Sequence, residues 1–382
     1  MRKICVVVGS RANYSSIKSV MKAIQDHPNL ELQLVLGASA LLDRYGTVSD
    51  QIKLDGFEPV AEVFMLIEGE TPTTMAKSTG VGLMELPTVF DRLNPDIVLT
   101  IGDRFETMAT TLAAAYMNIP VAHTMGGEVT GTIDESIRHA VTKFAHIHFP
   151  ASQDAKDRIV KLGEREEDIF LVGCPRIDLV DEILNNGSIS LDKSLHEGVG
   201  ADININNPFI LVSQHPVTTE YGQGEKQITM TLKAVRNTGL PAIVLWPNAD
   251  AGSDDIARGM RKWREKGLDK NMHFYKNLPV NHYIHLMKKT SCLIGNSSSG
   301  IREGAFIGTP VVNIGTRQDM RERGKNVVDV TNETEKVFIS LISQIEHGPY
   351  ESEPIYGDGN AGKKIADILS MCSWKIQKRI TY

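Results

Sequence analysis

The sequence predicts an α/β protein made of two doubly wound domains, each a parallel sheet covered by helices. Three observations lead to this prediction. Short β-branched runs alternate with helical patterns along the chain, as in repeated βα units. The length of 382 residues suits two domains of ordinary size. A polar stretch at 185–207, poor in apolar residues, interrupts the alternation and predicts a linker.

The first domain is predicted to span residues 1–184. Its β-branched runs predict strands at Ile4–Val8, Leu32–Leu36, Ile97–Ile101, Pro120–Thr124, Ile147–Phe149 and Ile169–Val172. Apolar residues spaced i, i+3, i+4, i+7 predict two sheet-covering helices, one through Ile17, Val20, Met21 and Ile24 and one through Ile137, Ala140, Val141 and Phe144.

The second domain is predicted to span residues 208–358 with the same alternation. Its strands are expected at Phe209–Ser213, Ala242–Leu245, His273–Tyr275, Cys292–Gly295, Val311–Ile314 and Val327–Val330. Its helices are expected near Lys226–Arg236, Asp255–Glu265, His282–Lys289, Ile301–Ile307 and Glu333–Ile345. A C-terminal segment, 359–382, contains one more amphipathic helix at Gly362–Lys378.

The composition is that of a globular protein and excludes several classes. Lys and Arg total 41 and Asp and Glu total 47, a formal charge of −6, with the two signs interleaved. Binding to nucleic acid or to a membrane surface needs positive charge concentrated on one face. We therefore expect neither partner. The hydrophobic fraction of 41% also excludes a disordered chain.

The N-terminal residues and the cysteines bear on the compartment. Met1-Arg2-Lys3 is followed by only five apolar residues, which predicts a strand and not an export signal. No apolar run approaches the roughly 18 residues of a membrane-spanning helix. The cysteines are far apart and form no Cys-x-x-Cys pair, so we expect reduced core residues and a cytoplasmic protein: Cys5, Cys174, Cys292 and Cys372.

Polar segments follow several predicted strands, and ligands of doubly wound sheets bind beyond those carboxyl ends. The turn after the first strand lacks the Gly-x-Gly-x-x-Gly spacing, so no dinucleotide site is expected. Two interpretations of this turn stay open. Ser15 caps the following helix, or Arg11 and the helix amides meet an anionic ligand.

Three carboxylates lie close together in the first domain. Asp103 follows the third strand, Glu128 follows the fourth, and Asp134 comes shortly after. A single carboxylate in such a place is more often a helix cap or a solvated charge, and Asp134 also suits a helix start. Three within about thirty residues, beside glycines that permit close approach of a ligand, favour acid–base chemistry.

The second domain offers a phosphate cradle. Ser297, Ser298 and Ser299 put three hydroxyls before Gly300 at the start of a predicted helix, where unpaired amides favour an anion. Glu303, one turn later, suits the two hydroxyls of a ribose, or it stabilises the helix dipole. His215 ends a strand, where an imidazole is either catalytic, phosphate-facing or structural. The three arginines at 317, 321 and 323 usually mean a solvated face.

No metal or cofactor is expected. The Walker sequence Gly-x-x-x-x-Gly-Lys-Ser/Thr is absent. The histidine pairs at 146 and 148 and at 282 and 285 lack a third ligand at a recognisable spacing.

Six segments together resemble the hydrolysing UDP-N-acetylglucosamine (UDP-GlcNAc) 2-epimerases of sialic acid biosynthesis. They keep the order and spacing of that family's motifs over residues 4–330: Gly102–Glu106, Gly126–His139, Gln214–Pro216, Pro247–Gly252, Asn296–Gly300 and Gly315–Gln318. The resemblance implies the glycosyltransferase-B fold, two Rossmann-like domains facing a cleft, with a C-terminal helix that crosses back to the first domain. It also implies formation of N-acetylmannosamine (ManNAc) and UDP, without NAD.

The resemblance also assigns roles to residues. For proton handling it implies Asp103, Glu128 and Asp134, with His215 as a further catalytic candidate. For the nucleotide and its pyrophosphate it implies Arg11, Ser15, Arg104, His215, Asn248, Ser297, Ser298, Glu303 and Arg317, and the cradle adds Ser299 and Gly300.

One position departs from the family pattern. Relatives often have Glu two residues after the motif's His123, where this chain has Met125. Either Glu128 takes over as the base, or Asp103 and Asp134 suffice. The rival hypotheses are the same reaction on UDP-N,N'-diacetylbacillosamine, a glycosyltransferase of the same fold, and a non-catalytic UDP-sugar sensor. The segment Gly131–Asp134 looks more like the GlcNAc branch. We also expect a homo-oligomer.

Overall fold

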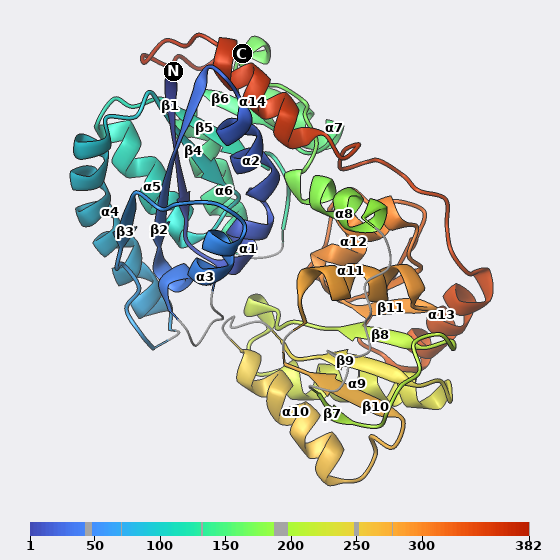
Figure 1. The fold of residues 1–382 in the computed structure, drawn as a ribbon. Coiled ribbons are helices and arrows are strands. Elements are labelled where there is room, and N and C mark those ends of the chain that lie inside the picture. Colours follow the sequence, from blue (N-terminus) through green and yellow to red (C-terminus); the bar gives the residue numbers. More distant parts are fainter. Residues whose placement is uncertain are drawn as a thin grey trace. The chain divides into compact units, whose positions relative to one another are not determined.

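A computed structural model describes residues 1–42, 48–69, 71–130, 133–186, 198–247, 252–276 and 278–381 (Figure 1). The chain divides into two compact units. Unit 1 comprises Met1–Val129, Ile133–Leu179 and Tyr356–Tyr382, and unit 2 comprises Thr130–Thr132 and Val180–Ile355. Of the predicted linker, residues 187–197 lie outside the described residues.

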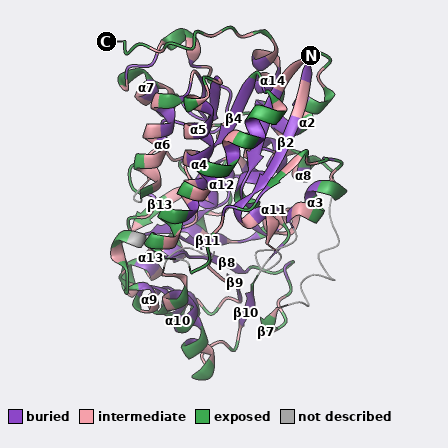
Figure 2. Cartoon of the chain, turned by 90° about the vertical axis from the view of Figure 1, so that its left-hand side faces the viewer, coloured by how far each residue is buried: buried purple, intermediate pink, exposed green. Residues whose placement is uncertain are grey.

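Unit 1 is built on a six-stranded parallel sheet in the order β3-β2-β1-β4-β5-β6. Its strands are β1 (Arg2–Val8), β2 (Leu30–Gly37), β3 (Ala61–Val63), β4 (Ile97–Ile101), β5 (Val121–Thr124) and β6 (Ile147–Phe149). The strands are largely buried except for the edge strand β3, where Glu62 is exposed, and Figure 2 shows exposed residues on the outer faces of the helices. Burial on both sides of the sheet explains why these strands read as continuous apolar runs.

The helices of unit 1 cover that sheet. They are α1 (Arg11–Ser15), α2 (Lys18–Asp26), α3 (Val48–Leu54), α4 (Pro72–Leu93), α5 (Phe105–Tyr116), α6 (Ile133–Phe144), α7 (Gln153–Lys161), α8 (Pro175–Asn185), which continues into unit 2, and α14 (Ala361–Met371). Two 3-10 turns lie at Ala38–Leu41 and Glu166–Asp168. The predicted apolar face of α2 is confirmed, because Ile17, Val20, Met21 and Ile24 are fully buried.

Two predicted elements of unit 1 end early. The strand expected at Ile169–Val172 is wrong, because only Ile169 pairs, in an isolated bridge with His148. The chain then leaves the sheet at Gly173, which has φ +94° and lies against Gly357. The last helix stops at Met371 instead of continuing to Lys378.

The side chain of Arg2 explains why α14 stops there. It donates to the carbonyls of Leu369 and Cys372, the latter at 3.0 Å, and lies 4.8 Å over the ring of Trp374. These contacts satisfy the last helical carbonyls. At its other end, α14 begins with the amides of Ala361 and Gly362 bound to the carboxylate of Asp178, at 2.9 and 2.7 Å.

Unit 2 contains a seven-stranded sheet in the order β13-β12-β11-β8-β9-β10-β7. All neighbours are parallel except the edge strand β7, which is antiparallel to β10. Its strands are β7 (Val199–Gly200), β8 (Ile210–Ser213), β9 (Ala242–Leu245), β10 (Met272–Tyr275), β11 (Cys292–Gly295), β12 (Val311–Ile314) and β13 (Val327–Val330).

The helices of unit 2 are α9 (Gly224–Asn237), α10 (Ser253–Glu265), α11 (Val280–Lys289), α12 (Ser298–Ile307) and α13 (Thr334–His347), with a 3-10 turn at Thr218–Glu220. The predicted α/β class, with two Rossmann-like sheets, is confirmed. Within the described ranges, no helix is both long enough and apolar enough to cross a membrane.

Candidate active site

The polar residues of unit 1 gather between β1 and β4, where the order in which successive strands join the sheet reverses. β1 and β4 are neighbours, but the chain runs from β1 outward to β2 and from β4 outward to β5. Such a point opens a crevice beyond the strand ends, where α/β proteins bind ligands. The segments that follow β1, β4 and β5 hold Arg11, Asp103 and Glu128 respectively.

A buried arginine holds two of the predicted carboxylate positions. Arg138, on α6, is 1% exposed. Its Nη2 is ion-paired with the carboxylate of Asp103, and its Nη1 donates to the backbone carbonyl of Glu128 at 2.8 Å. One guanidinium therefore fixes the segments after β4 and after β5 relative to each other. The Glu128 side chain is itself buried, at 3% exposure.

The predicted inner face of α6 is confirmed at Val141, but it did not include Arg138. The inward residues are Arg138, Val141 and Thr142, whereas Phe144 is 39% exposed. The apolar pattern assigned the inner face to Ile137 and Phe144, since an arginine counts as a surface residue in such a pattern. Its contacts with Asp103 and with the Glu128 carbonyl, both in other segments, account for its burial.

The loop that carries Glu128 depends on two glycines. Gly127 has φ +76°, and a Cβ there would lie 2.2 Å from the carbonyl oxygen of Ala155. A Cβ at Gly126 would lie 2.9 Å from Nδ1 of His123. No other residue type fits both positions, so these glycines are required for the chain to reach Glu128 in this conformation.

His123 connects the ends of β4 and β5. Its Nε2 lies 2.8 Å from the carbonyl oxygen of Gly102, directly before Asp103, so the ring donates from Nε2. Burial lowers the pKa of His123 to about 4, and this effect outweighs the opposing hydrogen bond to Gly102. The imidazole is therefore a neutral structural support for Asp103.

Met125 occupies the position at which the chain departs from the motif of the family that it resembles. It has φ +59°, is 6% exposed, and accepts the thiol of Cys174 at 3.5 Å on its Sδ. The side chain is packed into unit 1 and carries no proton. Met125 therefore offers no acid–base group at this position.

Asp134 lies in the first turn of α6 and is half-buried. It precedes Arg138 by four residues, so both lie along one side of the helix. The two residues before α6, Gly131 and Thr132, lie outside the described residues.

The turn after β1 differs from one prediction. Ser10, not Ser15, caps α1, because its Oγ accepts the amide of Asn13 at 3.2 Å. Ser15 ends that short helix, where its Oγ accepts Nη1 of Arg176 at 2.9 Å. Partial desolvation and then the charge of Arg176 lower the pKa of Arg11, whose side chain is exposed. Arg176 is therefore a second cation at this turn, which the sequence did not predict.

In unit 2, Asn296 organises the strand ends. Its Oδ1 accepts the amide of His215 at 2.7 Å, and its Nδ2 donates to the carbonyl of His215 at 2.9 Å. Its own carbonyl accepts Nη1 of Arg317 at 3.1 Å and Nε2 of Gln318 at 3.0 Å. This buried amide therefore brings two predicted site residues, His215 and Arg317, together.

The serines lie at the start of α12. Ser297 is the N-cap, Ser298 is half-buried, and Ser299 is buried. The hydroxyl of Ser299 bonds to Ser297 at 2.8 Å and to the phenol of Tyr283 at 2.5 Å. Tyr283 was not anticipated, because nothing in the sequence links it to this helix.

Two other predicted residues of unit 2 are closely surrounded by protein. Gly300 is packed so closely that a Cβ would lie 3.0 Å from Val311, and Glu303 is 1% exposed. Asn248 lies outside the described residues. The arginine run is not simply a solvated face, since Arg321 is buried and donates to Gln318 at 3.0 Å.

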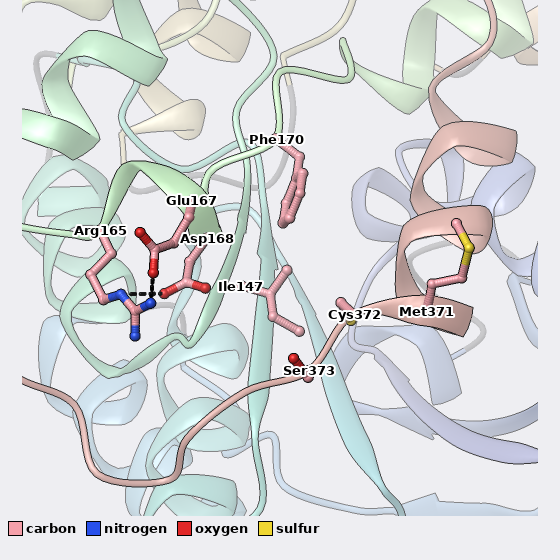
Figure 3. A pocket seen from close by; sticks show the side chains of 8 residues that line it. All are labelled: Ile147, Arg165, Glu167, Asp168, Phe170, Met371, Cys372 and Ser373. Carbon is pink, nitrogen blue, oxygen red and sulfur yellow. Dashed lines mark ion pairs between the residues drawn. The ribbon is translucent and has the colours of Figure 1, made fainter.

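A separate cavity in unit 1 carries no site residue. It has a volume of about 350 Å³, and Figure 3 shows its lining: Ile147, Arg165, Glu167, Asp168, Phe170, Met371, Cys372 and Ser373. Ile147 begins β6, so the cavity lies toward the amino ends of the strands. Its only arginine is already paired with Glu167 and Asp168. In the portion of the chain that is described, no three His, Cys, Asp or Glu side chains gather as a metal site requires.

The two sheets, parallel except for the edge strand β7, define an α/β protein with two Rossmann-like units, a class that binds ligands beyond its strand ends. The chain belongs to the UDP-N-acetylglucosamine 2-epimerase family, which matches residues 22–370.

Curated relatives agree with this assignment. The chain is 32% identical to the hydrolysing UDP-N,N'-diacetylbacillosamine 2-epimerase of Legionella pneumophila, covering 97% of this chain and 96% of that protein. It is 28% identical to a UDP-N-acetylglucosamine 2-epimerase of Neisseria meningitidis serogroup B, covering 97% and 95%.

Solved structures show the same fold. UDP-GlcNAc 2-epimerase of Neisseria meningitidis, bound to UDP-GlcNAc, aligns with a TM-score of 0.82 at 20% identity over 96% of this chain and 99% of that chain. The enzyme of Methanocaldococcus jannaschii, in complex with UDP-GlcNAc and UDP, aligns with a TM-score of 0.81 at 17% identity over 96% and 99%. The predicted glycosyltransferase-B type of fold is thereby confirmed.

Proposed function

We propose that this chain is a hydrolysing epimerase that converts UDP-GlcNAc to ManNAc and UDP for sialic acid biosynthesis. The observation that carries the proposal is the position of Arg138, which holds the Asp103 carboxylate and the Glu128 segment beside each other. The family membership supports a UDP-sugar substrate, and a curated relative from Escherichia coli is a polysialic acid biosynthesis protein.

The reaction needs more than one acid–base group. As the bond between C1 and the UDP oxygen stretches, positive charge on the ring makes the C2 proton acidic. A carboxylate removes that proton, the electron pair forms the C1–C2 double bond, and UDP leaves with the bonding pair. Water then adds at C1 and gives one of its protons to a carboxylate, and C2 takes a proton from a second acid on the opposite face. One carboxylate cannot serve both faces, so a second proton donor is required.

In our proposal the carboxylates of Asp103, Glu128 and Asp134 supply and remove these protons. The arginines and the amides at the start of α12 stabilise the departing pyrophosphate, with His215 facing the phosphates, and Glu303 binds the ribose hydroxyls. The full set of nucleotide-binding residues is Arg11, Ser15, Arg104, Asn248, Ser297, Ser298, Ser299, Gly300, Glu303 and Arg317. Donors aimed at a developing negative charge contribute about 3–4 kcal/mol each in other enzymes.

The second candidate is the same reaction on UDP-N,N'-diacetylbacillosamine. The specific observation in its favour is the 32% identity to the Legionella enzyme, against 28% to the Neisseria one. The two substrates differ at the sugar and share the nucleotide, so both require the same leaving-group contacts. The cytoplasmic location, the homo-oligomer and the absence of metal and cofactor stay predictions.

The test is to incubate the purified chain with each UDP-sugar in D2O and follow UDP and free sugar. We expect UDP release from UDP-GlcNAc and ManNAc with deuterium at C2. Asp103→Asn should abolish release, whereas Asp91→Asn, which changes an exposed carboxylate of α4, should not. Release only from UDP-diacetylbacillosamine would favour the second candidate. UDP binding without release from either sugar would instead identify a sensor.

A further inference from the structure

Glu106 is a buried carboxylate near the ends of β1 and β4, where the strand order of the unit 1 sheet reverses. It lies in the first turn of α5, directly after the β4 end that carries Asp103, and is 3% exposed. Neither the family motif assignments nor the proposed reaction gives it a role.

The side chain of Glu106 fills the space above the end of β1. A Cβ at Gly9 would lie 2.4 Å from Cγ of Glu106 and 3.1 Å from its carboxyl carbon. The carboxylate therefore extends from the end of β4 across the backbone at the end of β1. These two strands flank the crevice in which ligands of such sheets bind.

The carboxylate of Glu106 is bound from one direction. Its Oε1 accepts the Nε–H of Arg104 at 2.9 Å. Its Oε2 is buried and has no hydrogen-bond partner among the described residues. An unsatisfied buried acceptor costs about 1–3 kcal/mol, and a buried charge costs more unless it is paired. Because a buried glutamate lowers the stability of the folded protein in this way, packing alone does not account for Glu106.

The pairing determines how Arg104 presents its charge. The guanidinium of Arg104 is 39% exposed, and its Nε is tied to the buried carboxylate. A guanidinium fixed through Nε keeps its two Nη groups in one plane and orientation, which suits bidentate contact with a phosphate. An arginine without that anchor loses rotamer freedom when it binds, and this loss weakens binding.

We infer that Glu106 is a positioning residue that orients Arg104 toward the pyrophosphate of the UDP-sugar. This inference rests on the proposed function, since it takes the anionic ligand to be a nucleotide diphosphate. It predicts that the two residues act as one unit, so removing either has the effect of removing both.

A double-mutant cycle on UDP affinity, measured by calorimetry, tests the inference. Glu106→Leu keeps the bulk but loses the acceptor, and we expect it to raise the Kd for UDP about tenfold. Glu106→Gln retains an acceptor for Nε and should stay within about threefold of the wild type. Arg104→Ala should raise the Kd as Glu106→Leu does, and the double variant should bind no more weakly than Arg104→Ala alone.

Two further variants separate orientation from stability. Arg104→Lys keeps a positive charge but has no guanidinium that Glu106 could hold through Nε. The Kd of this variant for UDP should therefore rise as well. Arg104→Lys tests the inference even if Glu106→Leu does not fold. Glu164→Gln changes another buried glutamate of unit 1, bound by Lys143, His148 and Lys378. That control should lower the melting temperature and leave the Kd unchanged.

The outcomes distinguish this inference from the proposed function. Additive losses in the cycle, or wild-type affinity in Arg104→Lys, would overturn the role of Glu106 while leaving an active epimerase. A wild-type chain that neither binds UDP nor releases it from a UDP-sugar would overturn both.

Discussion

The guanidinium of Arg138, on α6, is paired with the carboxylate of Asp103, which follows β4. The cation is 1% exposed, while the Asp103 side chain is 25% exposed. A buried cation thus orients a carboxylate that still reaches solvent, where a substrate can meet it. The same cation also binds the Glu128 carbonyl, so it links two segments of the candidate site.

Replacing Arg138 should damage both stability and activity. In Arg138→Met the Asp103 carboxylate loses its partner, and we expect a loss of about 2–3 kcal/mol in the free energy of unfolding, less than for a fully buried pair. UDP release should fall at least about 100-fold, because the carboxylate is no longer oriented. Denaturant unfolding and steady-state kinetics measure these effects. An Arg138→Met chain that keeps wild-type turnover would contradict this role.

Asn296 should affect nucleotide affinity through His215 and Arg317. Asn296→Ala removes both side-chain hydrogen bonds to the His215 backbone, so its buried amide and carbonyl lose their partners. We expect the Kd for UDP to rise about tenfold or more. Asn296→Asp is the matched variant, because its carboxylate still accepts the amide but cannot donate to the carbonyl. The Kd of Asn296→Asp should lie between those of the wild type and Asn296→Ala. Equal affinity for UDP in all three proteins would rule out a role of Asn296 in nucleotide binding.

Gly127 should tolerate no side chain. In Gly127→Ala the new Cβ meets the Ala155 carbonyl at 2.2 Å, at a backbone φ of +76°, so the loop before Glu128 has to move. We expect a destabilisation of about 2–4 kcal/mol together with loss of UDP release. The matched control is Gly80→Ala on α4, where a Cβ meets nothing within 4 Å. The control should be neutral or slightly stabilising in thermal melts.

The stability of the protein should depend on pH through His123. The native pKa of about 4 lies below the ordinary histidine value of about 6.5, so folding favours the neutral ring. The resulting stability is complete above about pH 6.5 and is lost as the pH falls through about 4, amounting to about 3 kcal/mol at most.

His123→Gln tests this dependence. The glutamine amide can donate to the Gly102 carbonyl but does not titrate, so the loss of stability between pH 7 and pH 5 should be smaller in this variant. His347→Gln is the control, because that histidine is exposed in unit 2. Unfolding curves at both pH values provide the measurement. Identical pH dependence in the wild type and His123→Gln would refute the role.

Much of the fold could be predicted from the sequence, because buried parallel strands are continuous apolar runs and α2 has a regular apolar face. The strand expected at Ile169–Val172 was wrong because a close contact between Gly173 and Gly357, far apart in sequence, turns the chain away. The last helix was predicted to extend to Lys378, but it ends at Met371. At that end its carbonyls are bound by Arg2, which lies at the other end of the chain and therefore left no local signal.

The sequence by itself determined the α/β class, the positions of most strands along the chain, and the placement of Asp103 and Glu128 after strands and of the serines at the start of α12, because these depend on neighbouring residues. Only the tertiary structure decided that Arg138 faces inward, that Asn296 holds His215 and that Glu106 lies over Gly9. Each of these is a contact between distant segments, whose free energy is gained only when the chain is folded. Local periodicity therefore carries no information about them.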